Sequence, residues 1–355
     1  MSLLSDLLAA RTAAGPVPAA EVMALALYHP QAGYYRRPEG PWGFQGADYY
    51  TALDLGPLLG EALAERLARA WERLGRPDPF VVLEPGAGRG WLGRDLLRAA
   101  DGAFARALRY LHRDDNPAAV AAAREALGPY LATGQARLVA QDQPLEPFLG
   151  AVVANELFDA LPAQPWRWNG QAWQYEALGP EGPMWLEGAA GPASEWFTAQ
   201  AEGGLEPGDG APWCEGLPEL VRDLAGALRA GLFLAIDYGE SGPRLVDKGA
   251  DLRRFRGHQV DGRWWEEPGL CDLTADVDFT RLAALLAGSG LEPAPVTSLG
   301  RWIRGHAPLD RWEAEWPDLP EAERLRRTEN LLQLTLPTKM GDRFRVLEAW
   351  KGVET

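Results

Sequence analysis

A glycine-rich loop, VVLEPGAGRG over residues 81–90, is the part of the chain best suited to hold a ligand. Glycines at positions 86, 88 and 90 let the backbone turn tightly and leave room for a ligand against the main chain. The apolar run before them predicts a strand, and the residues after them predict a helix. The loop also contains a literal GxGxxG, formed by Gly88, Gly90 and Gly93, so a dinucleotide-binding loop is the first alternative.

Three features of the loop argue against a dinucleotide. In the dinucleotide pattern the first glycine follows the strand almost directly, whereas Glu84, Pro85 and Gly86 come between here. A pyrophosphate prefers a helix N-terminus without nearby negative charge, and Glu84 places an acid close to it. The order ExGxGxG resembles the first motif of methyltransferases that use S-adenosyl-L-methionine (SAM), a cofactor with an α-amino group and no phosphate. This resemblance predicts that Glu84 and the three loop glycines bind SAM.

Acidic and amide side chains follow the next two predicted strands. Asp114 lies about two dozen residues after Gly90, at the end of the strand in ALRYLHRDD, where a carboxylate can accept both ribose hydroxyls. We expect Asp115 to cap the following helix instead. Gln141 and Asp142 end the third strand, where an acceptor could bind the adenine amino group.

The fourth predicted strand leads into NELFDALP, which places Asn155 and Glu156 at the carboxyl edge of the sheet. Methyl transfer is an in-line displacement, so the protein mainly aligns the nucleophile and excludes water. A carboxylate such as Glu156 can pair with a guanidinium in a two-bond fork and hold one nitrogen toward the methyl group. Asp159 is expected to add a second carboxylate from the same helical face, with helix capping as the alternative. The predicted catalytic residues are therefore Asn155, Glu156 and Asp159.

Further polar side chains are expected to line the substrate pocket. Asp237 and Tyr238 follow the fifth predicted strand, LFLAIDYGE, at the same edge of the sheet. Of the four histidines only His258 is a pocket candidate, and we expect the other three at the surface. The histidines and the two cysteines, Cys214 and Cys271, lack metal-ligand spacing, so no metal is predicted.

The order of the predicted elements indicates an α/β protein. Residues 1–75 are expected to form a helical extension, and strands then alternate with helices over 76–161 and again over 218–355. This alternation predicts a parallel, Rossmann-like doubly wound sheet with ligands at the carboxyl ends of its strands. Seven strands with a closing strand pair favour a class I methyltransferase sheet over a six-stranded dehydrogenase.

Two irregular segments interrupt this alternation. Residues 162–217 are rich in glycine, proline and tryptophan, and QPWRWNGQAWQYEAL predicts a β-hairpin around Asn169 and Gly170. We expect this Trp-rich segment to form an inserted β-rich lobe, and a loop that merely packs is the alternative. A second irregular insert is expected over 241–274.

Composition limits the partners and the location. The 355 residues are 46% hydrophobic, enough to bury a core, and no run approaches the roughly 20 apolar residues that span a bilayer. The formal net charge of −15 argues against nucleic acid and is compatible with a cationic substrate, although it also provides solubility. The two cysteines form no CxxC pair and do not suggest a disulfide framework, which favours a reducing cytoplasm as the location.

Taken together, the motifs resemble the MidA type of methyltransferase, a family that includes the mitochondrial complex I assembly factors. The resemblance covers nearly the whole chain and rests on YHPQAGYY, ADYYTALDLGPLLGE, LEPGAGRG, NELFDALP, AIDYGE, RRFRGHQ, PGLCDLTADVDF and PTKMGDRF. It implies a class I methyltransferase sheet with an N-terminal extension and an inserted lobe. It also implies SAM contacts for the three loop glycines and a ribose contact for Asp114, with Asn155 and Glu156 facing the acceptor.

The same resemblance supplies the remaining candidates. The family motif GDF-x-TSPE appears here as ADYYTALD, with the first glycine lost, Ser-Pro replaced by Ala-Leu and the acid shortened to Asp54. Asp48 and Thr51 remain candidates near the methionine end of SAM. Asp276 and Asp278, in the motif PGLCDLTADVDF, are expected in the substrate pocket.

The family's best-described activity is symmetric dimethylation of an arginine in the 49-kDa-type subunit of the complex I peripheral arm, which supports assembly and converts SAM to S-adenosyl-L-homocysteine. The sequence therefore predicts a cytoplasmic, bacterial protein arginine methyltransferase without a transmembrane segment. One alternative is a small-molecule N- or O-methyltransferase. Another is an assembly chaperone that binds SAM and transfers nothing.

Overall fold

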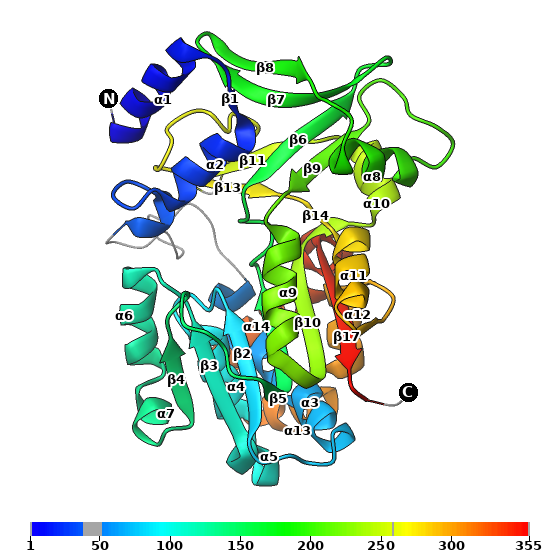
Figure 1. Ribbon diagram of the computed structural model, residues 1–355. Coiled ribbons are helices and arrows are strands. Elements are labelled where there is room, and N and C mark those ends of the chain that lie inside the picture. The colour runs from blue at the N-terminus through cyan, green and yellow to red at the C-terminus, as the bar shows by residue number, and fades with distance from the viewer. Residues whose placement is uncertain (1, 38–51, 258, 354–355) are drawn as a thin grey trace. The chain divides into compact units, whose positions relative to one another are not determined.

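The computed structural model describes residues 2–37, 52–257 and 259–353, and the chain divides into two compact units (Figure 1). Unit 1 comprises Met1–Tyr50, Phe158–Leu220 and Tyr238–Leu282. Unit 2 comprises Thr51–Leu157, Val221–Asp237 and Ala283–Thr355. The predicted extension 1–75 is thus divided between the units, while the segments 162–217 and 241–274 both belong to unit 1.

Unit 2 is built on a mixed sheet with the strand order β15-β17-β10-β5-β2-β3-β4. Along this path lie β15 (Glu292–Pro293), β17 (Phe344–Lys351), β10 (Leu228–Glu240), β5 (Phe148–Asn155), β2 (Phe80–Pro85), β3 (Leu108–Arg113) and β4 (Ala136–Val139). The five strands from β10 to β4 are parallel, and β17 is antiparallel to β15 and to the short β16 (Thr297–Ser298). The predicted doubly wound sheet with seven strands along its path is confirmed; β16 and β14 (Val277–Asp278) lie off the path.

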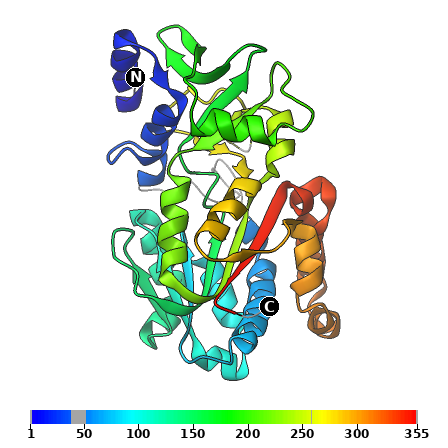
Figure 2. The ribbon, with the colours of Figure 1, turned by 45° about the vertical axis from the view of Figure 1, so that its right-hand side comes forward.

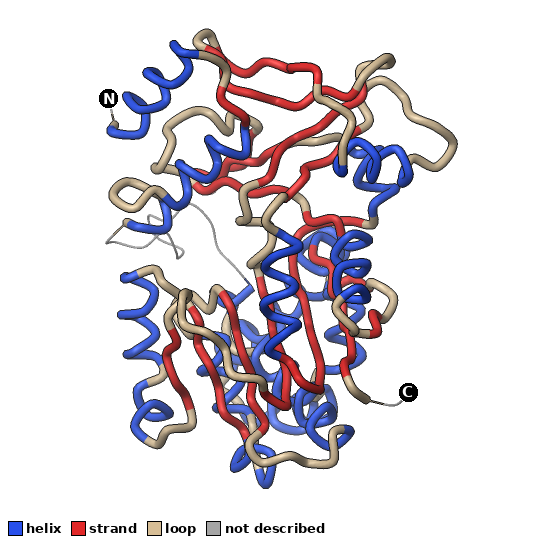
Figure 3. The backbone as a smooth tube through the Cα atoms, viewed as in Figure 1, coloured by secondary structure: helices blue, strands red, loops and turns tan. Residues whose placement is uncertain are grey.

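Helices alternate with these strands (Figure 3). They are η2 (Ala52–Leu55), α3 (Leu58–Arg73), α4 (Trp91–Ala99), α5 (Gly102–Ala107), α6 (Pro117–Ala126), α7 (Gly128–Ala132), α9 (Leu217–Ala227), α11 (Phe279–Gly288), α12 (Leu299–His306), α13 (Leu309–Glu315), η3 (Trp316–Asp318), α14 (Glu321–Thr335) and η4 (Pro337–Gly341). α9 covers one face of the sheet, and α3 and α4 cover the other (Figure 1). The C-terminal helices lie beside β17 (Figure 2).

Local sequence explains where two of these helices end or begin. α3 stops before Gly75, whose φ of 78° is the left-handed conformation that glycine adopts most easily after a helix. α6 begins at Asn116, whose side chain accepts hydrogen bonds from the backbone N–H groups of Ala118 and Ala119. The prediction that Asp115 caps this helix is therefore wrong.

Unit 1 contains an antiparallel sheet with the order β1-β7-β6-β9, to which β8 adds on β7. Its elements include α1 (Leu3–Ala14), β1 (Val17–Pro18), α2 (Ala19–Tyr28), η1 (Tyr34–Arg36), β6 (Ala163–Trp168), β7 (Trp173–Gly179), β8 (Gly182–Glu187), α8 (Pro192–Gln200), β9 (Gly210–Cys214) and α10 (Gly242–Lys248). The predicted hairpin is confirmed, because β6 and β7 pair with Trp168 opposite Trp173.

The Trp-rich segment has its own hydrophobic core. Trp173 and Phe197 are buried in it together with Leu245 and Val246 of α10, and four more tryptophans pack against it: Trp166, Trp168, Trp196 and Trp213. This arrangement supports the β-rich lobe over a loop that merely packs.

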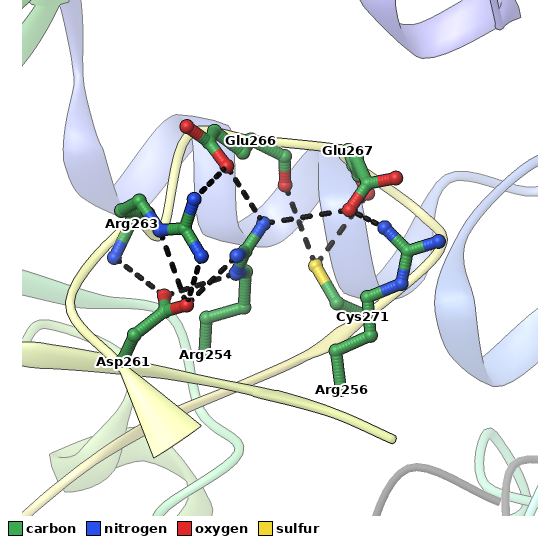
Figure 4. A network of polar contacts seen from close by, with 7 residues as sticks. All are labelled: Arg254, Arg256, Asp261, Arg263, Glu266, Glu267 and Cys271. Atoms are coloured by element: carbon green, nitrogen blue, oxygen red, sulfur yellow. Dashed lines mark hydrogen bonds and ion pairs between the residues drawn. The ribbon is translucent and has the colours of Figure 1, made fainter. Parts of the chain in front are cut away.

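A second sheet of unit 1 has the order β12-β11-β13, formed by β11 (Leu252–Arg256), β12 (Gln259–Asp261) and β13 (Asp272–Ala275). Arg254 is almost buried beside it and forms a two-bond fork with Asp261, at 3.0 and 2.8 Å, and a further bond to Glu266 at 3.2 Å (Figure 4). The bonds from Arg254, together with those from Arg263, lower the pKa of Asp261 well below its ordinary value. The network fixes β11, β12 and the segment after them to one another.

Neither Cys214 nor Cys271 forms a disulfide. Of the helices within residues 2–37, 52–257 and 259–353, none is long and apolar enough to cross a membrane.

Candidate active site

The loop between β2 and α4 has the backbone shape that its glycines predict. Gly86, Gly88 and Gly90 have φ values of 65°, 52° and 68°, in the left-handed region that other residues rarely adopt. A Cβ atom on Gly86 would lie 2.8 Å from Leu157 Cδ1, whereas one on Gly88 would meet no atom of the described residues within 4 Å. The loop therefore packs closely at Gly86 and is open at Gly88.

Two side chains of the β3 segment hold the open part of the loop. Asp114 Oδ2 accepts a hydrogen bond from the Gly88 N–H at 2.8 Å, and His112 Nε2 donates to the Gly88 carbonyl at 2.7 Å. Because a carbonyl can only accept, the hydrogen of this imidazole lies on Nε2. Asp114 also accepts from the Asn116 N–H at 2.8 Å, and each carboxylate oxygen still has a lone pair for a hydroxyl. Asp114 thus lies beside the open part of the loop, and its contact with the ribose stays a prediction.

His112 corrects a prediction. It is fully buried, although we expected it at the surface. Burial lowers the pKa of His112, so the ring is neutral at pH 7, and its Nδ1 is buried without a partner in the described part of the chain. The sequence could have predicted the position of His112. Side chains alternate along a strand, so Tyr110, His112 and Asp114 share one face.

Glu84 is buried opposite His112 in the pairing of β2 with β3. Tyr110 donates its hydroxyl to Glu84 Oε2. Burial raises the pKa of Glu84 to about 8, against the effect of the Tyr110 bond, and Asp114 raises it further. At pH 7 this group is mostly neutral, so the argument that its charge repels a pyrophosphate is wrong. Its observed partner is Tyr110, and direct contact with SAM stays a prediction.

The predicted adenine-binding residues follow β4, and their contact with adenine stays a prediction. Gln141 and Asp142 lie exposed in the turn after β4. The contact recorded for Gln141 is through its backbone carbonyl, which accepts from Arg113 Nη2 at 2.6 Å.

Asn155 and Glu156 stand at the carboxyl end of β5, as predicted. Glu156 has a φ of 50°, which is unusual for a residue with a side chain, and its N–H donates to the Ile236 carbonyl at 2.9 Å. The next N–H, of Leu157, donates to the buried Asp237 at 3.1 Å. These two bonds fix the turn against β10, and the contact of Leu157 with Gly86 brings it to the glycine loop.

Asn155 supplies an unsatisfied acceptor. Its Nδ2 donates to Glu156 Oε1 at 3.4 Å, while its Oδ1 is buried and has no hydrogen-bond partner among the residues described. A buried acceptor without a partner costs free energy, so a ligand N–H that bonds it would be stabilised. The two side chains therefore place an amide oxygen and a carboxylate side by side.

Asp159, Tyr238 and Asp276 belong to unit 1, where they surround Arg253. Its guanidinium pairs with Asp276 at 2.6 Å and lies 5.6 Å from the centre of the Tyr238 ring. Lys248 also pairs with Asp276. Burial raises the pKa of Asp276, but the two cations outweigh it, so this acid stays charged.

Asp159 itself is buried, and burial raises its pKa to about 6 although Arg253 opposes the shift. Residues 156–162 form bends and turns, so the expectation that Asp159 shares a helical face with Glu156, or caps a helix there, is wrong.

Asp278 is occupied by contacts within unit 1. It accepts from the Arg281 N–H at 3.0 Å, which caps the start of α11, and from Trp196 Nε1 at 2.7 Å. Burial raises the pKa of Asp278. These contacts give Asp278 a structural role. It also lines a small pocket of unit 1 together with Asp276, so a contact with the substrate stays a prediction.

Three predicted residues, Asp48, Thr51 and His258, lie outside the described residues. Asp54, the shortened acid of the N-terminal motif, forms an ion pair with Arg89 of the glycine loop at 2.7 Å. The sequence did not predict this ion pair between Asp54 and Arg89.

The site fits SAM. The open backbone at Gly88 leaves room for the ligand, Asp114 stands beside it for the ribose, and Asn155 Oδ1 provides a buried acceptor. A doubly wound sheet with this loop after β2 and an acid after β3 has the architecture of Rossmann-like nucleotide-binding proteins, the class that includes the SAM-dependent methyltransferases of class I.

Comparisons with known proteins give the particular family. Residues 62–297 match the family described as "Putative S-adenosyl-L-methionine-dependent methyltransferase", and the chain belongs to it. A protein of Burkholderia thailandensis whose crystal structure contains S-adenosyl-homocysteine is 26% identical, with a TM-score of 0.86 over 99% of this chain and 94% of that one. Fold class and cofactor are thereby confirmed.

Curated relatives are also similar. Protein arginine methyltransferase NDUFAF7 homolog, mitochondrial, of Drosophila melanogaster is 28% identical over 99% of this chain and 85% of its own length. The human protein arginine methyltransferase NDUFAF7, mitochondrial, is 25% identical over 93% and 79%. The resemblance to the MidA type is confirmed. The prediction of a cytoplasmic location is contradicted, because these relatives are named mitochondrial.

Proposed function

We propose that this enzyme transfers methyl groups from SAM to an arginine of a protein. The finer proposal is symmetric dimethylation of the 49-kDa-type subunit of the complex I peripheral arm, in support of assembly. The names of the curated relatives support a protein arginine acceptor. The observation that carries the proposal is the Asn155–Glu156 pair beside the glycine loop.

The chain's own residues would act mainly by orientation. SAM, when bound, supplies a methyl group on a positively charged sulfur. The Glu156 carboxylate pairs with the guanidinium in a two-bond fork and turns one nitrogen toward that methyl group. Asn155 Oδ1 accepts an N–H of the same guanidinium, which satisfies its buried lone pairs. The bonds from Glu156 N–H and Leu157 N–H to β10 keep both side chains in place during the reaction.

A labelling experiment tests the proposal. The full chain is incubated with SAM carrying a labelled methyl group and a lysate of cells that lack this protein, and the protein and small-molecule fractions are analysed by mass spectrometry. We expect label in protein, with none when Glu156→Gln replaces the wild type. A labelled small molecule would instead favour a small-molecule N- or O-methyltransferase. SAM binding with no label in either fraction would favour the assembly chaperone.

A further inference from the structure

The connection between β4 and β5 leaves part of the sheet of unit 2 open. Residues 140–147 run as turn and loop and include Pro144 and Pro147 (Figure 3). A parallel crossover usually carries a helix that covers the sheet. Here the connection passes β3 and β2, which lie between β4 and β5. A cavity of about 520 Å³ remains against the starts of these strands.

The floor of this cavity is mostly apolar. Val81, Leu111, Val139 and Leu149 line it, together with Phe148 and several prolines. Strand pairing sets Val81 opposite Arg109 and Leu111 opposite Arg137, so these four side chains share one face of the sheet. We call this cavity the crossover groove.

Three arginines line the crossover groove: Arg109 on β3, Arg137 on β4 and Arg229 on β10. Within the described ranges no ion pair involves any of them. Arg109 Nη1 donates only to nearby backbone carbonyls, those of Arg106 and Leu108. Two carboxylates, Asp78 and Glu146, also line the groove without pairing to these arginines. The three guanidinium groups outnumber these two carboxylates. On a chain with a net charge of −15, this local excess of positive charge favours an anionic partner.

The shape of the groove selects the class of partner. Its arginines lie on strands from β4 to β10, and five adjacent strands span about 19 Å at their usual spacing. An extended peptide covers that length with about six residues. A compact anion could reach only part of this row.

We propose that the crossover groove binds an extended segment of a partner protein in which acidic side chains alternate with apolar ones. Its apolar side chains lie on the floor, and its carboxylates pair with the three arginines. The groove lies at the amino ends of the strands and the glycine loop at the carboxyl end of β2, so this binding is separate from methyl transfer.

Fluorescence anisotropy with a labelled eight-residue peptide that alternates Glu with Leu and Val tests the proposal on the full chain. Saturable binding is expected, weakening at high salt, while the counterpart with Lys in place of Glu should not bind. The triple variant Arg109→Gln, Arg137→Gln, Arg229→Gln should weaken acidic-peptide binding by about tenfold or more. A matched control removes three exposed arginines of unit 2 outside the groove, by Arg98→Gln, Arg124→Gln and Arg222→Gln. This variant should bind the acidic peptide as tightly as the wild type.

Several outcomes would overturn the proposal. They are no binding of the acidic peptide, equal binding of the Lys peptide, and equal loss in both triple variants. Saturable binding of dodecanoate in the absence of any binding of the acidic peptide would show a small-ligand site instead. The comparison of the two peptides on wild type needs no variant, so it stands even if the groove variant fails to fold.

Discussion

Glu156 combines two features that rarely occur together: a carboxylate side chain and a left-handed backbone held by a hydrogen bond to β10. Strain of this kind persists where the surrounding structure enforces it, often at functional sites. If its carboxylate orients the guanidinium, Glu156→Gln loses the charged fork but keeps the size of the side chain. We expect methyl transfer to fall by about a hundredfold or more while SAM affinity stays nearly unchanged.

The matched control for this change is Glu65→Gln, which removes an exposed carboxylate of α3 paired with Arg69. It should leave activity at the wild-type level, as measured by initial rates at saturating SAM. Normal turnover in Glu156→Gln would remove the role we assign to Glu156.

His112 offers a test of how β3 shapes the cofactor loop. His112→Phe removes the donor to the Gly88 carbonyl, and calorimetric titration should show SAM affinity about tenfold weaker. His112→Gln places an N–H at a similar reach and should recover most of the loss. If the Phe and Gln variants bind SAM alike, the bond to Gly88 is not what positions the loop.

Glu84 should make stability depend on pH in a defined direction. The unfolded chain loses this proton near pH 4.5, whereas the folded chain keeps it up to about 8. Unfolding therefore releases a proton between these values, and the free energy of unfolding falls as pH rises through them. Glu84→Gln removes this contribution, so the variant should gain on wild type from pH 5 to 8 by up to about 1.4 kcal/mol per unit. Urea unfolding at three pH values measures the difference, and a constant difference would contradict the raised pKa.

Much of the residue-level site was predictable, because acids and amides at strand ends meet at one edge of a parallel sheet. Asp114, Asn155 and Glu156 were placed at strand ends this way, and their contacts with SAM and with the acceptor stay predictions. The same rule places Gln141 and Asp142 in the exposed turn after β4, which ends at Val139, and their contact with adenine stays a prediction. It also could not show that Glu84 is neutral, because that depends on burial against Tyr110 from another strand.

At the scale of elements, α4 and β3 approach closely at one glycine. A Cβ atom on Gly93 would lie 2.1 Å from Cζ of Tyr110, so Gly93→Ala must push the helix or the ring aside. We expect a loss of about 2–3 kcal/mol in the free energy of unfolding, measured by urea titration. Gly226→Ala in α9 is the control, because its Cβ would meet no atom of the described chain within 4 Å. That change should stabilise the helix by about 0.5–1 kcal/mol. If Gly93→Ala and Gly226→Ala changed the free energy of unfolding equally, the contact between α4 and Tyr110 would have to adjust to the added methyl group without loss of stability.

Element types followed from periodicity, but some boundaries did not. The hairpin at Asn169 was predicted from a local turn signal, and β6 and β7 confirm it. The segment after β5 was expected to be helical, yet hydrogen bonds of Glu156 and Leu157 to β10 hold it as a turn. Those partners lie about 80 positions along the chain, beyond any local pattern.

At the scale of the whole molecule, the sequence suggested separate inserts in one sheet domain. The structure instead groups the first 50 residues with 158–220 and 238–282 in one unit. A hydrophobic cluster of that unit joins Met23 and Leu27 of α2 to Leu252 of β11 and Leu273 of β13, more than 200 residues along the chain. Contacts of this kind are set by tertiary packing, which a pass along the sequence does not reveal.

The chemical identity of the methyl acceptor tests the central claim most directly. Protein labelled by the full chain with methyl-labelled SAM is hydrolysed in acid, and the labelled amino acid is identified by chromatography and mass spectrometry. The account predicts symmetric dimethylarginine. Label in lysine or another amino acid, or label confined to small molecules, would contradict it.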